Sequence, residues 1–235
     1  RGVKLASADW VMLLHDDDKL LPAFRLAMPK VAAHLLDGKV GFAHWNGAKH
    51  GLHGAHATGV QVTLPLPTGV YDSEMLRVPL LGKNMNLSPV SGLFRREHLI
   101  KVLEECEEIK SAFILRPGMM VGNDLLTWLR AMESYERFFY FKEPLISYGH
   151  WEGSTTMDDI NNHRGRLAPL YDKMRRYFLS LRNEASGPEF IFPQADDGQS
   201  RLVHAVERHP ARTAEEGYRQ KAAAESWQAL YENGA

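Results

Sequence analysis

The chain has 235 residues, with 28 Lys and Arg against 29 Asp and Glu, a net charge of −1 at pH 7 and 44% hydrophobic residues. This length and composition allow a sizeable core in one domain or a domain and a half. A charge near zero, with scattered basic residues, gives no electrostatic case for nucleic acid or an anionic membrane as the main partner.

The only cysteine, Cys106, excludes an internal disulfide and fits a reducing compartment. Because Leu99, Val102 and Leu103 precede it at helical spacing, we expect a small core residue and not a reactive thiol. No apolar run reaches the roughly 20 residues of a membrane-spanning helix. We therefore expect a cytoplasmic protein.

The chain opens with the predicted end of a helix (1–8), followed by a short apolar run (10–14) that predicts one buried strand. That run stops at His15-Asp16-Asp17-Asp18. Adjacent carboxylates repel one another, so three after a strand favour a divalent cation, with Mg²⁺ or Mn²⁺ preferred by oxygen ligands. The alternative is that Asp18 caps the next helix.

A helical pattern follows from Pro22 to Leu36, with Pro29 expected to kink or split it, and residues 40–45 predict a second strand. Strand, helix and strand in this order favour a parallel sheet covered by helices, in which ligands bind at the carboxyl ends of strands. Because the three aspartates lie at such an end, the order favours a metal over a cap.

Residues 46–59 form a predicted glycine-rich loop that carries His50, His53 and His56. A zinc site is one interpretation, but a glycine-rich loop does not fix the spacing of the histidines, so we favour no ligand role. Residues 60–64 predict a strand, and 72–81 predict a short helix.

Residues 90–94 (Val-Ser-Gly-Leu-Phe) are a compact apolar element with small residues. Small residues there either let a ligand approach the backbone or serve close packing, and the sequence does not decide between the two. A helix is predicted from about residue 95 to 109, a strand over 111–115 and a loop over 116–122.

The next predicted helix begins with Asn123 as its N-cap and Asp124 in its first turn, where the helix dipole stabilises an anion. A carboxylate in that position is usually structural. An aromatic strand over 138–148, broken at Pro144, then leads into a loop (149–156) whose imidazole, glycines and hydroxyls suit phosphate and metal. A helix is predicted over 158–183, with Pro169 marking a kink or its true start, and the rest of the tail is polar.

Four segments in order, from residue 1 to about 156, resemble the family 2 glycosyltransferases of GT-A fold. The first is the run from Arg1 to Pro22, which looks like that family's helix, strand and DxD-type motif, with His15 at the position of its usual first aspartate. The third is Gly122-Asn123-Asp124-Leu125-Leu126, with Asn123 in place of the usual Glu. The second and fourth are Ser91-Gly92-Leu93-Phe94-Arg95-Arg96 and Tyr148-Gly149-His150-Trp151-Glu152-Gly153-Ser154.

The resemblance implies an α/β fold of GT-A type, with a mostly parallel sheet flanked by helices. The family's first βα units would precede Arg1, so we expect a partial catalytic domain (1–157) followed by a helical C-terminal extension (158–235). The resemblance further implies a metal-dependent, inverting glycosyltransferase of hexosyltransferase type. Its partners would be a nucleotide-sugar donor and a glycan or other hydroxyl acceptor in cell-surface glycan or polysaccharide synthesis.

The resemblance also assigns roles to individual residues. Asp124 would be the general base, although a helix start should lower its pKa and weaken it. Asp17 and His150 would bind the metal, Mn²⁺ or Mg²⁺. The remaining assignments are Asp16 for the ribose or a metal-bound water, Asp18 for orienting the loop, Ser154 for phosphate, and Ser91, Gly92 and Asn123 on the acceptor side.

Two other functions fit parts of the pattern. The first is a non-catalytic GT-A-like scaffold or glycan-binding module, in which His15 and Asn123 mark lost chemistry. The second is a nucleotidyltransferase, which would need a basic, glycine-rich phosphate loop near its start. Sequence alone leaves open the oligomeric state, any location at the inner face of a membrane, and whether the extension contacts a membrane or a protein partner.

Overall fold

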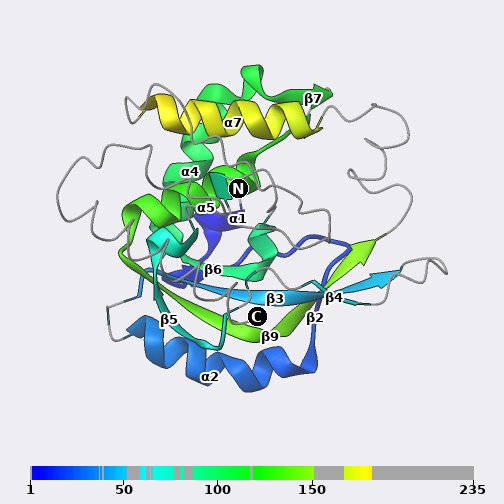
Figure 1. The fold of residues 1–235 in the computed structure, drawn as a ribbon, viewed down its shortest axis with the longest axis vertical. Coiled ribbons are helices and arrows are strands. Elements are labelled where there is room, and N and C mark those ends of the chain that lie inside the picture. The colour runs from blue at the N-terminus through cyan, green and yellow to red at the C-terminus, as the bar shows by residue number, and fades with distance from the viewer. Residues whose placement is uncertain are drawn as a thin grey trace, which may run out of the picture.

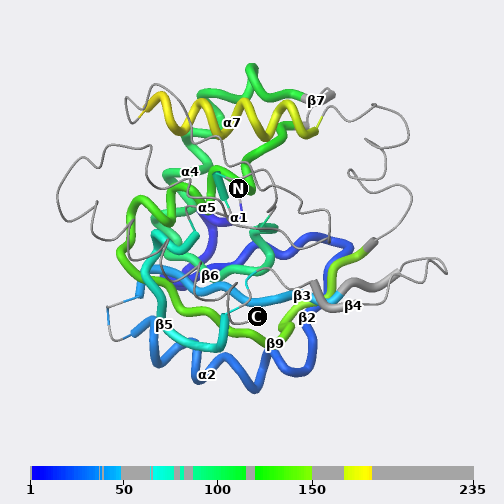
Figure 2. The backbone as a smooth tube through the Cα atoms, viewed as in Figure 1, coloured from blue at the N-terminus to red at the C-terminus, as the bar shows by residue number. Residues whose placement is uncertain are grey.

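The computed structural model describes residues 2–36, 38, 40–51, 59–61, 64, 66–76, 80–81, 87–116, 119–150 and 167–181, with the backbone alone at 49–51, 59–61, 115, 116, 119 and 150. Figure 2 draws most of their course in colour. The predictions for residues 52–58 and 151–166, and for the tail beyond 181, lie outside this part of the chain.

A seven-stranded sheet lies at the centre of the molecule (Figure 1), in the order β1-β6-β3-β9-β2, with β4 on β3 and β5 on β9. The strands are β1 Trp10–Val11, β2 Lys19–Leu20, β3 Phe42–Gly51, β4 Gly59–Gln61, β5 Gly69–Asp72, β6 Gly92–Arg95 and β9 Arg137–His150. A separate pair is formed by β7 Ile114–Arg116 and β8 Met119–Met120.

The expected mostly parallel pairing is wrong for the described strands. Only β3 and β9 pair in parallel, and each of the other pairs is antiparallel. The reason is that β6 lies between β1 and β3 and runs against both. The strand-helix-strand order did bring β1 and β3 into the same direction, but another strand separates them.

Helices cover both faces of this sheet, which confirms the α/β fold with flanking helices. In Figure 1, α2 lies on one side, and α4, α5 and α7 lie on the other. The α-helices are α1 Gly2–Leu5, α2 Pro22–Leu36, α4 Arg96–Ile109, α5 Asn123–Ser134 and α7 Leu167–Leu181; the short 3-10 helices are η1 Ser73–Leu76, η2 Pro89–Ser91 and η3 Lys110–Ala112. No helix in the described part of the chain is long and apolar enough to cross a membrane.

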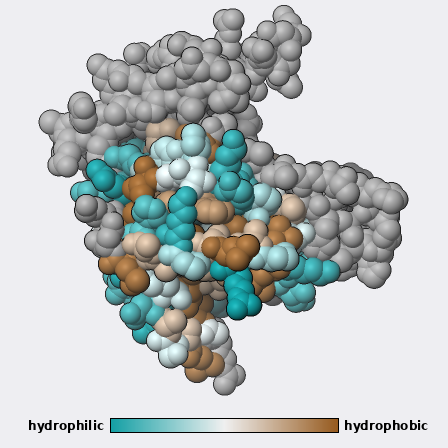
Figure 3. All heavy atoms as spheres, turned by 90° about the horizontal axis from the view of Figure 1, so that it is seen from below, coloured by the Kyte–Doolittle hydropathy of each residue, from teal (hydrophilic) through white to brown (hydrophobic). Residues whose placement is uncertain are grey.

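The helix α2 has the predicted bounds. Pro22 opens it, where a missing N–H costs nothing, and Pro29 lies inside one continuous helix, so the helix is not split. Beyond its end, Gly38 has a φ of 77°, a left-handed conformation that favours glycine after a helix. One face of α2 is buried against the sheet through Ala27, Val31 and Leu35. Seen from this side, hydrophobic and hydrophilic residues alternate over the surface (Figure 3).

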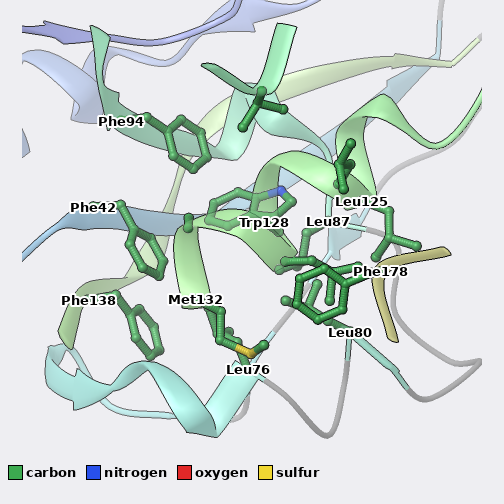
Figure 4. Close-up of a cluster of buried hydrophobic side chains, with 14 of the residues drawn as sticks. Phe42, Leu76, Leu80, Leu87, Phe94, Leu125, Trp128, Met132, Phe138 and Phe178 are labelled. Atoms are coloured by element: carbon green, nitrogen blue, oxygen red, sulfur yellow. The ribbon is translucent and has the colours of Figure 1, made fainter. Parts of the chain in front are cut away.

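The larger core lies between the sheet and the helices α4, α5 and α7 (Figure 4). Phe94, Phe42 and Phe138 are paired across three neighbouring strands, and their rings stack with centroids 6.2 and 5.4 Å apart. Trp128 of α5 meets Phe94 edge-on at 4.8 Å. A Cβ on Gly92 would lie 2.5 Å from the Trp128 ring, so close packing accounts for this glycine.

The described part of the predicted extension, α7, packs into this same core. Met174, Phe178 and Leu179 are buried in it beside residues of α5. In the described residues α7 runs over Leu167–Leu181 and includes Pro169, while the predicted helical residues 158–166 lie outside the described part. The domain boundary at 157/158 itself stays a prediction.

Candidate functional site

The acidic loop, residues His15–Asp18, joins β1 to β2 beside the end of β9. The backbone N–H of Gly149 donates to Asp18 Oδ1 at 3.0 Å. β2 then pairs with β9, and α2 starts only at Pro22, so the alternative of Asp18 as the cap of that helix is wrong. Instead, the Asp18 carboxylate accepts a hydrogen bond from a backbone N–H of strand β9.

The contact between this loop and β9 is too close for a larger residue than glycine. A Cβ on Gly149 would lie 2.4 Å from the backbone oxygen of Asp17 and 2.9 Å from its Cβ. The glycine therefore permits the acidic loop to lie directly on the strand end. The next residue, His150, ends β9 opposite Gly51; its side chain, and the whole of Ser154, lie outside the described residues.

Three side chains of the acidic loop could hold a metal ion. One ligand atom each of His15, Asp17 and Asp18 lie within 4.8 Å of one another. Asp18 has only 4% of its side chain exposed, and its buried Oδ2 faces the imidazole of His15. Two carboxylates fit Mn²⁺ or Mg²⁺, and an imidazole beside them favours Mn²⁺. The donor set therefore fits the predicted cation.

The imidazole of His15, when protonated, competes with a metal ion for the carboxylates of the acidic loop. His15 Nδ1 lies 3.3 Å from Asp18 Oδ2. The hydrogen bond to Asp18 raises the pKa of His15, against the opposing effect of burial. Only the neutral imidazole binds a metal, so cation binding there would release a proton. Asp16 lies exposed in the same loop, and its predicted contact with ribose or a metal-bound water stays a prediction.

The second cluster of polar groups forms at the start of α5. The N-cap is Gly122, with a φ of 91°, and not Asn123 as predicted. The left-handed backbone conformation at this position favours glycine, and a Cβ on Gly122 would lie 3.2 Å from side-chain atoms of Met174. Asn123 becomes the first helical residue and is exposed.

The Asp124 carboxylate is held through both oxygens. Oδ1 accepts from the Leu125 N–H at 2.8 Å, and Oδ2 accepts from the Tyr171 hydroxyl at 2.6 Å. Burial raises the pKa of Asp124, opposed by the hydrogen bond from Tyr171. The expectation that the helix start lowers this pKa is therefore wrong, because desolvation is the larger effect.

The acidic loop and the start of α5 share one electrostatic environment. The charge of Asp124 raises the pKa of His15, and the charge of His15 lowers the pKa of Asp124. Residues about 110 positions apart in sequence are thus brought within reach of each other's charge. The acidic loop and Asp124 are therefore coupled electrostatically through His15.

The residues predicted for acceptor binding lie mostly inside the protein. Ser91 and Gly92 are buried; the Ser91 carbonyl accepts from His44 Nδ1 at 2.9 Å, and its hydroxyl donates to the Ser88 carbonyl at 2.6 Å. The Ser91 side chain also hydrogen-bonds Tyr148, which precedes Gly149. These contacts support the strand end, and the acceptor role stays a prediction.

Two members of the site were not predicted from the sequence. His15 was noted as a departure from a motif, yet it joins the carboxylates of its own loop. Tyr171 lies in the helix predicted over 158–183 and had no functional role assigned, although its hydroxyl reaches Asp124. A tyrosine at an otherwise apolar, inward-facing helical position is the signal that would have identified it, because a buried hydroxyl needs a partner.

Comparisons with known proteins do not assign the chain to a family. No protein family matches the chain, and no curated protein matches it either. Among solved structures, it is similar to residues 1–349 of TarS from S. aureus, a GT-A-like glycosyltransferase, at 13% sequence identity and a TM-score of 0.42, over 98% of this chain and 68% of that one. The likeness is a distant one in overall fold.

Proposed function

We propose that this chain catalyses glycosyl transfer from a nucleotide-diphosphate sugar to an acceptor hydroxyl, with inversion at the anomeric carbon. The observation that carries the proposal is the grouping of His15, Asp17 and Asp18 in the acidic loop, together with the electrostatic interaction between His15 and the half-buried Asp124. A cation in the acidic loop and the Asp124 carboxylate would provide the two charges that the reaction needs. The order of the motifs in the sequence supports the same reaction.

In the proposed reaction, the acceptor oxygen forms a bond to the anomeric carbon while the bond from that carbon to the phosphate oxygen breaks. The nucleoside diphosphate leaves with the bonding electron pair. The proton of the acceptor hydroxyl passes to Asp124, whose pKa is raised by burial, which makes it a stronger base than an exposed aspartate. Asp124 thus holds the proton at the end of the reaction, and the nucleoside diphosphate holds the electron pair.

The acidic loop would act at the leaving group. Asp17 and Asp18, with neutral His15, would hold Mn²⁺ or Mg²⁺, which supplies Lewis-acid stabilisation of the negative charge on the diphosphate. Asp18 also fixes the loop through the Gly149 N–H. The assignment of His150 as a further ligand and Ser154 as a phosphate donor rests on the sequence resemblance alone.

The test is transfer of labelled sugar from a panel of nucleotide sugars to oligosaccharide acceptors in the presence of Mn²⁺. Asp124→Asn should lower kcat by about 100-fold or more, as expected for loss of a general base, with donor binding retained. Asp72→Asn is the matched control, because Asp72 accepts from the Glu74 N–H at the start of η1. Transfer near the wild-type rate by Asp124→Asn would overturn the proposal.

The cation site is tested separately by calorimetry. Asp17→Ala should abolish the Mn²⁺-dependent part of nucleotide-sugar binding, and Asp72→Asn should leave it unchanged. If Asp17→Ala bound donor and Mn²⁺ as the wild type does, the metal assignment would be rejected. The role of Asp124 would then still be decided by the transfer assay.

One observation favours a second function, a non-catalytic glycan-binding or scaffold module. The contact of His15 with Asp18 neutralises the buried carboxylate from within the protein, so the acidic loop has a charge partner without a metal. A wild-type chain that binds glycan but neither Mn²⁺ nor a nucleotide sugar would establish this alternative.

A further inference from the structure

A hydrogen bond joins helix α7 to the Asp124 carboxylate at the start of α5. The Tyr171 hydroxyl donates to Asp124 Oδ2 at 2.6 Å. We propose that Tyr171 is a positioning residue that fixes the Asp124 carboxylate for proton transfer, so that the segment after residue 157 takes part in the active site. This inference rests on the function proposed above.

The two hydrogen bonds of Asp124 determine the orientation of its carboxylate. With Oδ1 on the Leu125 N–H and Oδ2 on the Tyr171 hydroxyl, the group cannot rotate without breaking one of them. Each carboxylate oxygen has two lone pairs, so Oδ2 keeps one free direction in which to accept a proton. Without the Tyr171 hydroxyl, only the bond within α5 would remain.

Tyr171 is itself held in place because α7 is anchored along its length. Arg175 Nε donates to the Leu80 carbonyl at 2.9 Å, and Lys173 Nζ donates to the Ala112 carbonyl at 2.7 Å. Met174 and Phe178 of the same helix are buried in the larger core. A helix fixed at several points gives the Tyr171 hydroxyl a defined position, as preorganisation of a base requires.

Charged and titratable groups from three other elements interact electrostatically with Asp124. They are His15 from the acidic loop, Cys106 from α4, and Tyr171 and Arg175 from α7. Burial raises the pKa of Asp124, whereas the Tyr171 hydrogen bond and the charge of His15 lower it. Removal of the Tyr171 hydroxyl should therefore raise this pKa further.

The decisive variant is Tyr171→Phe, which removes the hydroxyl and keeps the ring. Its matched control is Tyr177→Phe on the same helix. The Tyr177 hydroxyl donates to Glu105 Oε1 at 2.9 Å, so this variant also removes a hydrogen bond from a hydroxyl to a carboxylate but leaves Asp124 untouched. Tyr171→Phe should lower kcat by about 10- to 100-fold, the scale of a misplaced catalytic group, with KM for donor and acceptor within about twofold. Tyr177→Phe should leave kcat and both KM values near those of the wild type.

A second measurement is independent of turnover. In protein with ¹³C-labelled aspartate, titration of the Asp124 carboxyl resonance should show a higher pKa in Tyr171→Phe and an unchanged one in Tyr177→Phe. Equal losses of kcat in the two variants, or wild-type kcat in Tyr171→Phe, would overturn the positioning role. A wild-type protein without transfer activity would overturn the proposed function, and with it the catalytic role of Tyr171, whereas the resonance would still report whether the contact exists.

Discussion

At the scale of single residues, Asp18 shows how the acidic loop is stabilised. A carboxylate as buried as this one is costly unless its oxygens find partners. One oxygen accepts from the Gly149 N–H, and the other faces His15. The first contact depends on the acidic loop lying directly on the end of β9, and that closeness depends on the missing side chain at Gly149.

Gly149→Ala tests this closeness. The added Cβ would meet the Asp17 backbone oxygen at 2.4 Å, so the loop or the strand must shift. We expect a loss of about 1–3 kcal/mol in the free energy of unfolding, as for overpacking, and weaker binding of Mn²⁺. Denaturant unfolding and calorimetry with Mn²⁺ measure the two effects.

The control is Gly69→Ala on β5, which also pairs with β9. Its Cβ would find Tyr71 ring atoms at 3.5 Å, an ordinary contact, so we expect a change within about 0.5 kcal/mol and unchanged Mn²⁺ binding. Similar losses in the two variants would show that Gly149 has no special relation to the acidic loop.

The residues of the site were predictable where local chemistry sufficed. The charge pattern and the strand-helix-strand order together favoured a cation site at Asp16–Asp18. Three side chains of that loop, His15, Asp17 and Asp18, do come together, and the cation stays a prediction. The partner of Asp18, Gly149, is 131 positions away, so no local pattern could decide between a cap and a strand contact. Asn123 has the chemistry of an N-cap, but the left-handed backbone falls on Gly122.

At the scale of elements, α4, α5 and α7 are joined by a partly buried cluster of charged and hydroxyl groups. Arg130 of α5 donates through Nε and Nη2 to the two carboxylate oxygens of Glu105 on α4, at 2.9 and 2.7 Å. The same Glu105 accepts from Tyr177 of α7. The cluster therefore contributes to the packing of these three helices against one another.

Arg130→Lys should destabilise the protein although it conserves the charge. Lysine cannot make the two-pronged contact with Glu105, and both side chains are less than one quarter exposed. We expect a loss of about 1–2 kcal/mol in denaturant unfolding. Lys4→Gln is the control, since it breaks the Lys4–Glu104 pair, in which both side chains are 56% exposed, and should cost under about 1 kcal/mol. Equal losses would contradict the prediction.

Helices were predicted more closely than strands, for a physical reason. The helices α2 and α4 follow from apolar spacing within the segment itself. By contrast, β1 has two residues where five were expected, and β3 runs to Gly51 through part of the predicted loop. The partner β9 provides the hydrogen bonds for that extension, and Gly47 leaves room for the Tyr148 ring, whose nearest atom would be 2.0 Å from a Cβ.

At the scale of the whole molecule, alternating strands and helices correctly predicted an α/β fold. The directions of the strands were not predictable in the same way. The pairing of β6 with both β1 and β3 joins segments more than 45 residues apart in sequence, and the amino-acid pattern of a four-residue strand does not encode its direction. Likewise, the pattern of residues 167–181 predicted a helix, but not that it would share the core of the preceding domain.

The stability of the whole chain should depend on pH through His44. This side chain is fully buried, its Nδ1 donates to the Ser91 carbonyl at 2.9 Å, and its ring meets Trp128 at 4.9 Å. Burial lowers the pKa of His44 to about 4, from 6.5 in an unfolded chain. Between these values, the unfolded chain binds more protons than the folded one, so stability is lost as the pH falls from 6.5 to 4 and is fully present above 6.5.

Denaturant unfolding at pH 4.5 and 7.5 measures this effect, which for His44 amounts to about 2–3 kcal/mol between the two values. His44→Asn keeps a donor near the position of Nδ1 but does not titrate, so its stability should fall less over this range than that of the wild type. His98, whose pKa is also lowered by burial, and the carboxyl groups titrate in both proteins and cancel in the difference. His44→Gln provides a second variant if Asn folds poorly. An identical pH dependence in wild type and variants would mean that His44 becomes protonated without unfolding the core, in conflict with its complete burial.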